Sequence, residues 1–270
     1  MCLTGCGRIR LRVKSDAVIR SNGFPPLLSA VSLLQHDAPM KAHAAYKSAK
    51  AGDQDAALEL VVDLAAAWIG GLRDRFKPGL SYVAPHAQEA TGDNAIPQTL
   101  AAVCAAFHDG CVDTEIVQSD RVYHTGADPM ERMAARAQFV GRVTPEAEYV
   151  LVDDVTNLGG TLAELSNFIQ ANGGVIRDVV VMVNAGRNQA LVPEKKFVRL
   201  IKERFGDEFT EIFGIEPAAL TANEAQYLVG FQSVDQLRNR LATAEQEIDR
   251  RLCSKGIARV SEEAPPGASA

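Results

Sequence analysis

Residues 149–162 read YVLVDDVTNLGGTL, and this stretch decides the fold. Its first four residues are apolar without alternation, which is typical of a strand buried on both faces. The run ends in two carboxylates, Asp153 and Asp154. A Gly-Gly-Thr sequence follows, and apolar residues then recur at helical spacing through Ile169. The stretch therefore predicts a strand, a loop and a helix in that order.

The predicted loop has the chemistry of a phosphate site. Glycines at a helix N-terminus bring unpaired backbone N–H groups and the positive end of the helix dipole to one place, where the Thr161 hydroxyl adds a donor. Asp153 and Asp154 would repel a phosphate, but they can accept hydrogen bonds from vicinal hydroxyls beside it. A ribose 5-phosphate meets both demands.

The segment VLVDDVTNLGGTL resembles the phosphoribosyl pyrophosphate (PRPP) binding motif of type I phosphoribosyltransferases, which is an apolar strand, two acids and a Thr-Thr-Gly-x-Thr-like loop. The resemblance implies that Asp153 and Asp154 are the catalytic pair that holds the ribose 2- and 3-hydroxyls. It implies Mg²⁺ as cofactor, held mainly by PRPP and by no protein ligand directly. The implied PRPP-binding residues are Thr156, Asn157, Leu158, Gly159, Gly160 and Thr161.

Two positions depart from the family pattern. Leu158 stands where the family commonly has Thr or Ser, so only its backbone N–H can serve the phosphate. Asn157 stands where the 6-oxopurine members carry an aspartate that acts on the purine, and an amide has no such basicity. Hypoxanthine and guanine are therefore not expected to be good acceptors, and the acceptor itself is not identified.

A first strand is expected at residues 80–84, followed by a loop and a helix that Pro97 opens. In open parallel sheets ligands bind outside the carboxyl ends of strands. The resemblance places Pro85, His86 and Ala87 near pyrophosphate, and a plain polar surface loop is the alternative.

Residues 114–119 are a second strand candidate, and residues 120–143 are rich in arginine. Arginine side chains that find no partner in the core are expected to pair with an anion from outside it. The run resembles the hood of bacterial ComF-type phosphoribosyltransferases, which implies a mobile lid; a solvated helix with internal ion pairs is the other interpretation. The candidate hood residues are Arg121, His124, Arg132 and Arg136.

Residues 178–184 read as another buried strand, which completes a parallel strand–helix–strand unit. The predicted fold is α/β, a doubly wound and mostly parallel sheet of the type I phosphoribosyltransferase kind, with a mobile hood and a C-terminal helical appendage. The expected divisions are a disordered extension at 1–39, the α/β domain at 40–192, the appendage at 193–260 and a disordered tail at 261–270.

The appendage contains two predicted capping boxes, at Thr221 and Ser233, each opening a helix. A helix-turn-helix with Arg238 and Arg240 on DNA is one interpretation. Acidic residues on the second helix favour a packing role instead.

Composition and charge bear on the partners and the cellular setting of the protein. The chain has 270 residues and a net charge of −6, so nucleic acid is not favoured as a partner. No apolar run is long enough for a membrane span. Five cysteines without a Cys-x-x-Cys suit a reducing, cytoplasmic setting.

The function expected is a phosphoribosyltransferase that uses PRPP and Mg²⁺ to attach ribose 5-phosphate to a nitrogen nucleophile, with a homodimer as a candidate assembly. A non-catalytic PRPP- or nucleotide-sensing regulator on the same fold is the second hypothesis, and a structural domain without PRPP is the third.

Overall fold

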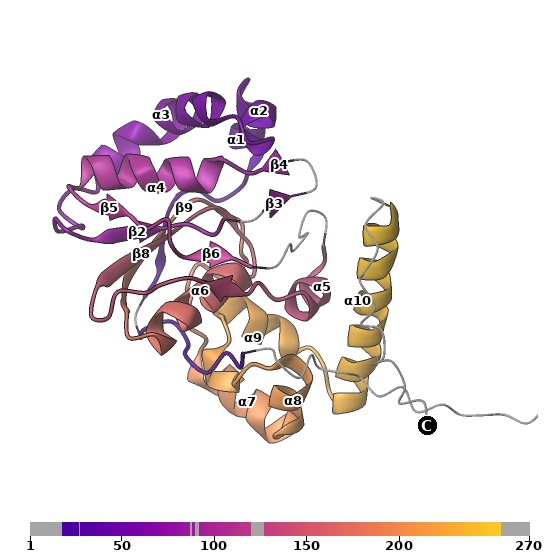
Figure 1. Ribbon diagram of the computed structural model, residues 1–270. Helices are drawn as coiled ribbons and strands as arrows, with labels where there is room; N and C mark the ends of the chain where they lie inside the picture. Colours follow the sequence, from indigo (N-terminus) through magenta and orange to yellow (C-terminus); the bar gives the residue numbers. More distant parts are fainter. Residues whose placement is uncertain (1–17, 27, 87, 90–91, 120–126, 255–270) are drawn as a thin grey trace, which may run out of the picture.

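A five-stranded parallel sheet forms the centre of the computed structural model (Figure 1). The structure describes residues 18–26, 28–86, 88–89, 92–119 and 127–254. The strand order is β1-β9-β8-β2-β5. The strands are β1 (Ala30–Leu34), β2 (Ser81–Val83), β5 (Cys111–Val112), β8 (Glu148–Thr156) and β9 (Val175–Asn184). Two antiparallel pairs lie outside it: β3 (Gln88–Glu89) with β4 (Gly92–Asp93), and β6 (Val117–Gln118) with β7 (Phe139–Val140).

Helices cover both faces of the sheet. Alternate side chains of β8 enter different cores: Val150 and Val152 pack with the N-terminal helices, whereas Tyr149 and Leu151 pack with α6. The N-terminal layer holds α1 (Ala38–Ala42), α2 (Tyr46–Lys50), α3 (Gln54–Gly70) and α4 (Ile96–Phe107). The opposite face carries α6 (Gly160–Ala171). This arrangement confirms the predicted doubly wound α/β class.

The connections leave β2 and β8 in opposite directions. From β2 the chain passes through α4 to β5 on one side, and from β8 it passes through α6 to β9 on the other. The carboxyl ends of β2 and β8 therefore flank a topological switch point, which is where open α/β sheets bind ligands.

The N-terminal boundary predicted near Met40 is wrong. Strand β1 pairs in parallel with β9 and completes one edge of the sheet. Arg20 lies further upstream with 1% of its surface exposed, and its backbone pairs with Ile215. The sequence did not reveal this segment, because its strand is short and because its buried, ion-paired arginine resembles a surface arginine in the sequence. Residues 1–17 lie outside the described part of the chain.

The strand predicted at residues 114–119 is also corrected. The strand that joins the main sheet beside β2 is β5, a few residues upstream. Strand β6 instead pairs with β7 and forms a small hairpin-like layer over the α6 side of the sheet. A two-residue edge strand carries too little periodicity to be read from the sequence.

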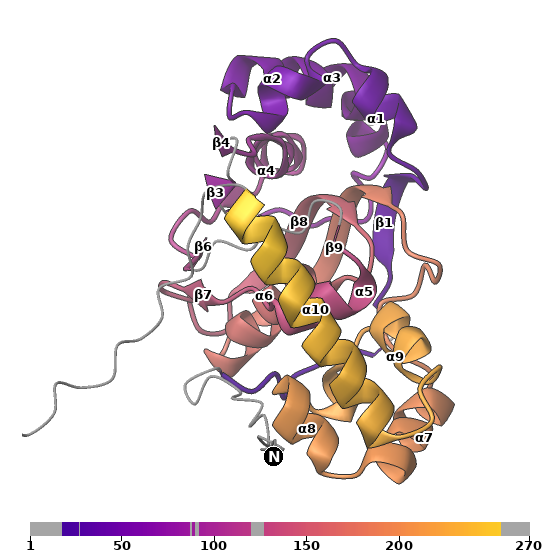
Figure 2. The same ribbon diagram turned by 90° about the vertical axis from the view of Figure 1, so that its right-hand side faces the viewer.

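The C-terminal helices pack together around a third core (Figure 2). Its helices are α7 (Lys195–Phe205), α8 (Glu208–Phe213), the short 3-10 helix η1 (Pro217–Ala219), α9 (Ala222–Leu228) and α10 (Val234–Ser254). The helix α5 (Pro129–Ala134), at the base of the hood, buries Met130 and Met133 in the same core. The tail predicted from residue 261 lies outside the described residues.

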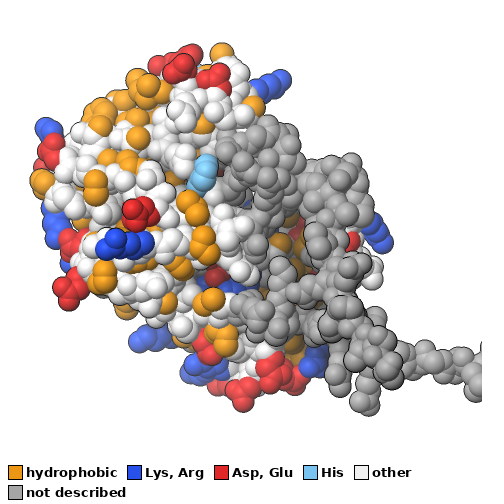
Figure 3. Space-filling view, viewed as in Figure 1, with side chains coloured by type: hydrophobic (Ala, Val, Ile, Leu, Met, Phe, Trp, Pro, Cys, Tyr) orange, Lys and Arg blue, Asp and Glu red, His pale blue; other side chains and the backbone are white. Residues whose placement is uncertain are grey.

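Two arginines of the C-terminal helices that are candidates for DNA contact pair with acidic side chains. Arg238 pairs with Glu208, and Arg240 pairs with Asp128 and Glu247. On the face drawn in Figure 3, lysine and arginine side chains are scattered among aspartate and glutamate. Among the described residues, no helix has both the length and the apolar character that crossing a membrane requires.

Candidate functional site

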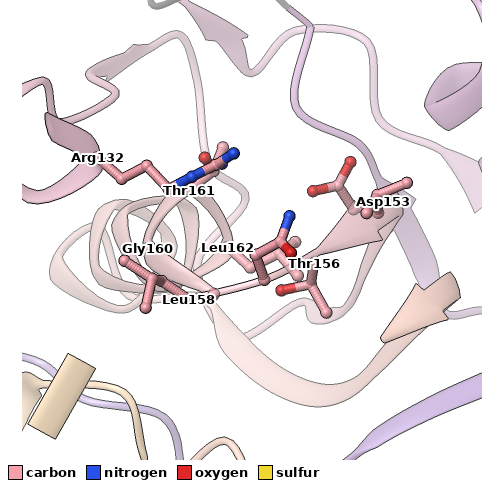
Figure 4. A pocket seen from close by; sticks show the side chains of 10 residues that line it. Arg132, Asp153, Thr156, Leu158, Gly160, Thr161 and Leu162 are labelled. Carbon is pink, nitrogen blue, oxygen red and sulfur yellow. The ribbon is translucent and has the colours of Figure 1, made fainter. Parts of the chain in front are cut away.

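The loop between β8 and α6 lines a pocket at the switch point (Figure 4). Asp153 points into it from β8, and Arg132 extends toward it from α5. The remaining lining residues are Val155, Thr156, Asn157, Leu158, Gly159, Gly160, Thr161 and Leu162. All six residues predicted to bind PRPP through this loop therefore line one pocket with Asp153. The resolved strand extends to Thr156, so both acids lie inside it rather than after it.

The backbone of the loop is arranged for an anion. Gly159 is the N-cap residue of α6 and has φ +79°, the left-handed conformation that favours glycine. Among the residues that the structure describes, no side chain caps α6, and its first turn carries no acid. Its first N–H groups have no partner within the helix and carry the positive end of the helix dipole. The loop thus presents backbone donors to the pocket.

The two acids of the motif lie on opposite sides of β8, because successive side chains of a strand alternate. Asp153 is half-buried and faces the pocket. Asp154 is buried and takes hydrogen bonds at Oδ2 from Lys50 Nζ (3.0 Å) and Asn94 Nδ2 (2.9 Å). Its Oδ1 accepts from the backbone N–H of Val155 at 2.8 Å. Both oxygens of Asp154 are therefore occupied within the protein.

This difference separates the proton affinities of the acids. Burial, and then the charge of Asp154, raise the pKa of Asp153 well above its usual value of 3.8. Burial opposes ionisation of Asp154 as well, but the charge of Lys50 and the hydrogen bond from Asn94 outweigh it and hold its pKa below 3.8. The pocket thus contains the acid that is easier to protonate.

Lys50 and Asn94 are site residues that the sequence alone did not reveal. Lys50 ends α2, and Asn94 precedes α4, where its Oδ1 accepts from the Ile96 backbone N–H at 3.2 Å. Both come from the N-terminal helical layer, far from the motif in sequence. No local pattern connects a single lysine at a helix end with an aspartate 104 residues away.

The described hood residues have different roles from one another. Arg132 lines the pocket, as predicted for a ligand-facing arginine, and its Nε donates to the Ala127 carbonyl at 3.0 Å. Arg136 faces away: it makes two hydrogen bonds to Glu164, at 2.7 and 2.8 Å, and donates to three backbone carbonyls. The expectation that Arg136 needs an external anion is wrong. Arg121 and His124 lie outside the described residues.

The predicted pyrophosphate loop begins at the carboxyl end of β2. The His86 carbonyl accepts from the Gln118 backbone N–H at 3.2 Å, which ties the loop to β6. Within the described part of the chain, His86 Nδ1 is buried and has no hydrogen-bond partner. Pro85 precedes it in the loop, and Ala87 lies outside the described residues. The role of this loop toward pyrophosphate stays a prediction.

The Leu158 side chain packs against the C-terminal core. Its carbonyl accepts a hydrogen bond from Thr221 Oγ1 at 2.5 Å. The apolar side chain at this position thus contributes to the C-terminal core, and the backbone carbonyl anchors the loop to the C-terminal helices.

Two groups of side chains have the spacing of a metal site elsewhere in the described structure. His43, Glu59 and Asp63 form one. His43 Nδ1 accepts the Ala45 backbone N–H at 3.2 Å, so in the neutral ring Nε2 carries the proton and is blocked as a ligand. Asp128, Glu131 and Glu247 form the other, and there Asp128 caps α5 and pairs with Arg240. Neither arrangement points to a metal.

Comparisons with known proteins give partial relatives. No family model matches the chain. Protein TraN of Escherichia coli is 36% identical over 219 residues, which is 77% of this chain and 48% of that protein. An uncharacterized protein of Haemophilus influenzae is 33% identical over 129 residues, 47% of this chain and 29% of that protein. The chain thus spans about half or less of the curated relatives it matches.

Among solved structures, the chain is similar to adenine phosphoribosyltransferase from Leishmania donovani, with 15% identity, TM-score 0.35, and coverage of 72% of this chain and 86% of that one. For the adenine phosphoribosyltransferase of Leishmania tarentolae, the identity is 12% and the TM-score is 0.33, with coverage of 58% of this chain and 96% of that one. For a hypoxanthine phosphoribosyltransferase from Staphylococcus aureus, the identity is 11% and the TM-score is 0.31, with coverage of 47% of this chain and 63% of that one. All three TM-scores are low, so these similarities carry no argument about this chain.

Proposed function

We propose that this chain is a phosphoribosyltransferase that binds PRPP and transfers its ribose 5-phosphate to a nitrogen nucleophile. The observation that carries the proposal is the pocket in which a half-buried acid, Asp153, shares one lining with an uncapped helix N-terminus at the switch point of the sheet. A ribose diol suits the acid, and a phosphate suits the helix end.

In this proposal the loop from Thr156 to Thr161 holds the 5-phosphate through backbone N–H groups and the Thr161 hydroxyl. Asp153 accepts hydrogen bonds from the ribose hydroxyls. Asp154 acts from the other side of the strand, where it fixes Lys50 and Asn94 at the carboxyl edge. Arg132 brings a positive charge to the pocket. In the transfer, the bond from the anomeric carbon to pyrophosphate breaks, a bond to the acceptor nitrogen forms, and the proton of that nitrogen passes to the departing pyrophosphate.

The residues of the pocket fit a divalent ion bound together with PRPP. Asp153 lines the pocket, and burial, followed by the charge of Asp154, raises its pKa, so a cation beside it would favour its ionised form. Mg²⁺ would shield the charge of the leaving pyrophosphate. The protein's own part is to hold the ribose and the phosphate in fixed positions.

A second hypothesis, a PRPP- or nucleotide-sensing regulator, is favoured by one observation. The phosphate loop is hydrogen-bonded to the C-terminal helices through Thr221, so occupancy of the loop could be transmitted to them. The two hypotheses share a ligand and differ in turnover.

The test combines binding and turnover. Calorimetry with PRPP and Mg²⁺ should show binding, and release of pyrophosphate should depend on one member of a panel of nucleobases and amines. Because Asn157 replaces the family aspartate, hypoxanthine and guanine are expected to be poor acceptors. Binding without turnover across the panel would favour the regulator, and absence of PRPP binding would contradict both.

A further inference from the structure

Thr221 connects the C-terminal helices to the phosphate loop. It is the N-cap of α9, with 1% of its surface exposed. Its Oγ1 accepts the backbone N–H of Glu224 at 3.1 Å and donates to the Leu158 carbonyl at 2.5 Å. One hydroxyl therefore caps a helix and anchors the loop at the same time.

The anchored carbonyl fixes the orientation of the following peptide. In a trans peptide the C=O and the N–H point in opposite directions. With the Leu158 carbonyl held against Thr221, the N–H of Gly159 turns away from the C-terminal helices, to the pocket side of the loop. The left-handed conformation of Gly159 then carries the chain into α6. Thr221 thus orients the first donor of the cradle.

Glu224 supports the same loop from beneath. Its Oε2 accepts the Thr221 backbone N–H at 2.8 Å, which completes the capping box. Its Oε1 lies 3.0 Å from the position of a Cβ built on Gly160, so it packs directly against the start of α6. A carboxylate at this place would repel a phosphate if it stood alone.

Two arginines offset that charge. Arg20 pairs with both Glu224 (2.5 Å) and Glu164 (3.2 Å), and Arg136 pairs with Glu164 at 2.7 Å. Two carboxylates therefore face two guanidinium groups under the first turns of α6. These four side chains belong to the N-terminal segment, the hood, α6 and α9, so they join all the elements around the loop.

We infer that Thr221 is a positioning residue of the phosphate cradle, so that the affinity of the pocket for a phosphorylated ribose depends on the packing of α9. The inference rests on the proposed function for the identity of the ligand. It assigns to the C-terminal helices a part in ligand binding, because their cap residue holds the peptide whose N–H faces the anion.

The test compares Thr221→Val, which keeps the shape and removes the hydroxyl, with Thr221→Ser, which keeps the hydroxyl. Calorimetry with PRPP and with ribose 5-phosphate should show affinity about five- to tenfold lower for Thr221→Val, the effect of one hydrogen bond, and within about twofold of the parent for Thr221→Ser. Thr210→Val is the matched control, since Thr210 makes a comparable bond to the Ile215 carbonyl within the same helices.

Hydrogen exchange of the ligand-free proteins gives a readout that does not need a ligand. The amide of Ala163, which donates to the Gly159 carbonyl at 2.9 Å, should exchange faster in Thr221→Val than in the parent, in Thr221→Ser and in Thr210→Val. Should Thr221→Val not fold, Thr221→Ala carries the same expectations. Equal affinity and equal exchange in Thr221→Val and the parent would overturn the inference. A parent that binds neither ligand would refute the proposed function, and the exchange result would still decide the role of Thr221.

Discussion

Two adjacent acids with different surroundings are the most instructive comparison in the molecule. Asp153 faces the pocket and has a raised pKa, whereas Asp154 faces the N-terminal helices and has a lowered pKa. The alternation of a strand separates two side chains that the motif presents as a pair. Asp153 is available to a ligand, and Asp154 holds Lys50 and Asn94 in place.

The largest expected effect is a crossover between substitutions of the two acids. Asp153→Ala should lower PRPP affinity about 10- to 100-fold (~1.5–3 kcal/mol), because it removes charge-assisted hydrogen bonds to the ribose. Asp154→Ala should instead lower the free energy of unfolding by about 1.5–3 kcal/mol, because it removes a buried carboxylate that accepts hydrogen bonds from Lys50 and Asn94. Calorimetry and urea unfolding measure the two quantities.

The crossover is the discriminating feature. If Asp154→Ala weakened PRPP binding as much as Asp153→Ala while unfolding at the parent's denaturant concentration, both acids would be ligand groups and the separation would be wrong.

The next effect is on pH dependence, and its sign differs between the acids. The folded pKa of Asp153 is raised, so its contribution to stability is present below 3.8 and is lost as the pH rises through the folded value. That of Asp154 is lowered, so its contribution is present above 3.8 and is lost as the pH falls through the folded value. Asp153→Asn should therefore gain stability relative to the parent as the pH rises above 3.8, and the stability that Asp154→Asn loses relative to the parent should be smallest at acid pH.

Denaturant unfolding of the ligand-free proteins across this range checks both signs. Parallel stability–pH curves for the parent and Asp153→Asn would show that Asp153 is not shifted upward.

A smaller effect is expected at the glycine of the cradle. Gly159→Ala places a side chain at φ +79°, which costs about 1 kcal/mol of stability, and relief of this backbone strain would shift the N–H groups of the cradle. Gly79 is a matched control, since it has φ +84° and open space around its Cβ position. Both variants should lose similar stability by thermal unfolding, but only Gly159→Ala should lose PRPP affinity. Equal affinities for both would place the cradle elsewhere.

The sequence predicted the strand, the loop and the helix of the motif because each is a local pattern. The apolar run of β8, the glycines before α6 and the capping box at Thr221 all lie within a few residues of the feature they specify. Local chemistry was therefore sufficient for these elements.

The errors have a common physical cause, which is pairing over long distances in the sequence. Arg20 reads as part of a polar leader, but its charge is offset by Glu224, 204 residues away. Arg136 reads as a ligand-seeking arginine, but Glu164 and three carbonyls satisfy it. The orientation of Asp154 depends on Lys50 and Asn94 in the same way. The partners of a buried ion pair can lie far apart in the sequence and leave no local pattern, so the pair becomes visible only in the folded structure.

The smallest effect concerns Leu158, and it tests whether the loop is held by its ligand or by the protein. The family pattern alone suggests that Leu158→Thr restores a hydroxyl and tightens PRPP binding. The structure favours another outcome, because the Leu158 side chain packs against the C-terminal core. The substitution should cost about 1 kcal/mol of stability through lost apolar burial, and PRPP affinity should stay within about twofold, since the carbonyl bond to Thr221 does not involve the side chain. Thermal unfolding and calorimetry measure both; a tighter PRPP complex at unchanged stability would show that the side chain can turn into the pocket and that the C-terminal helices do not hold it.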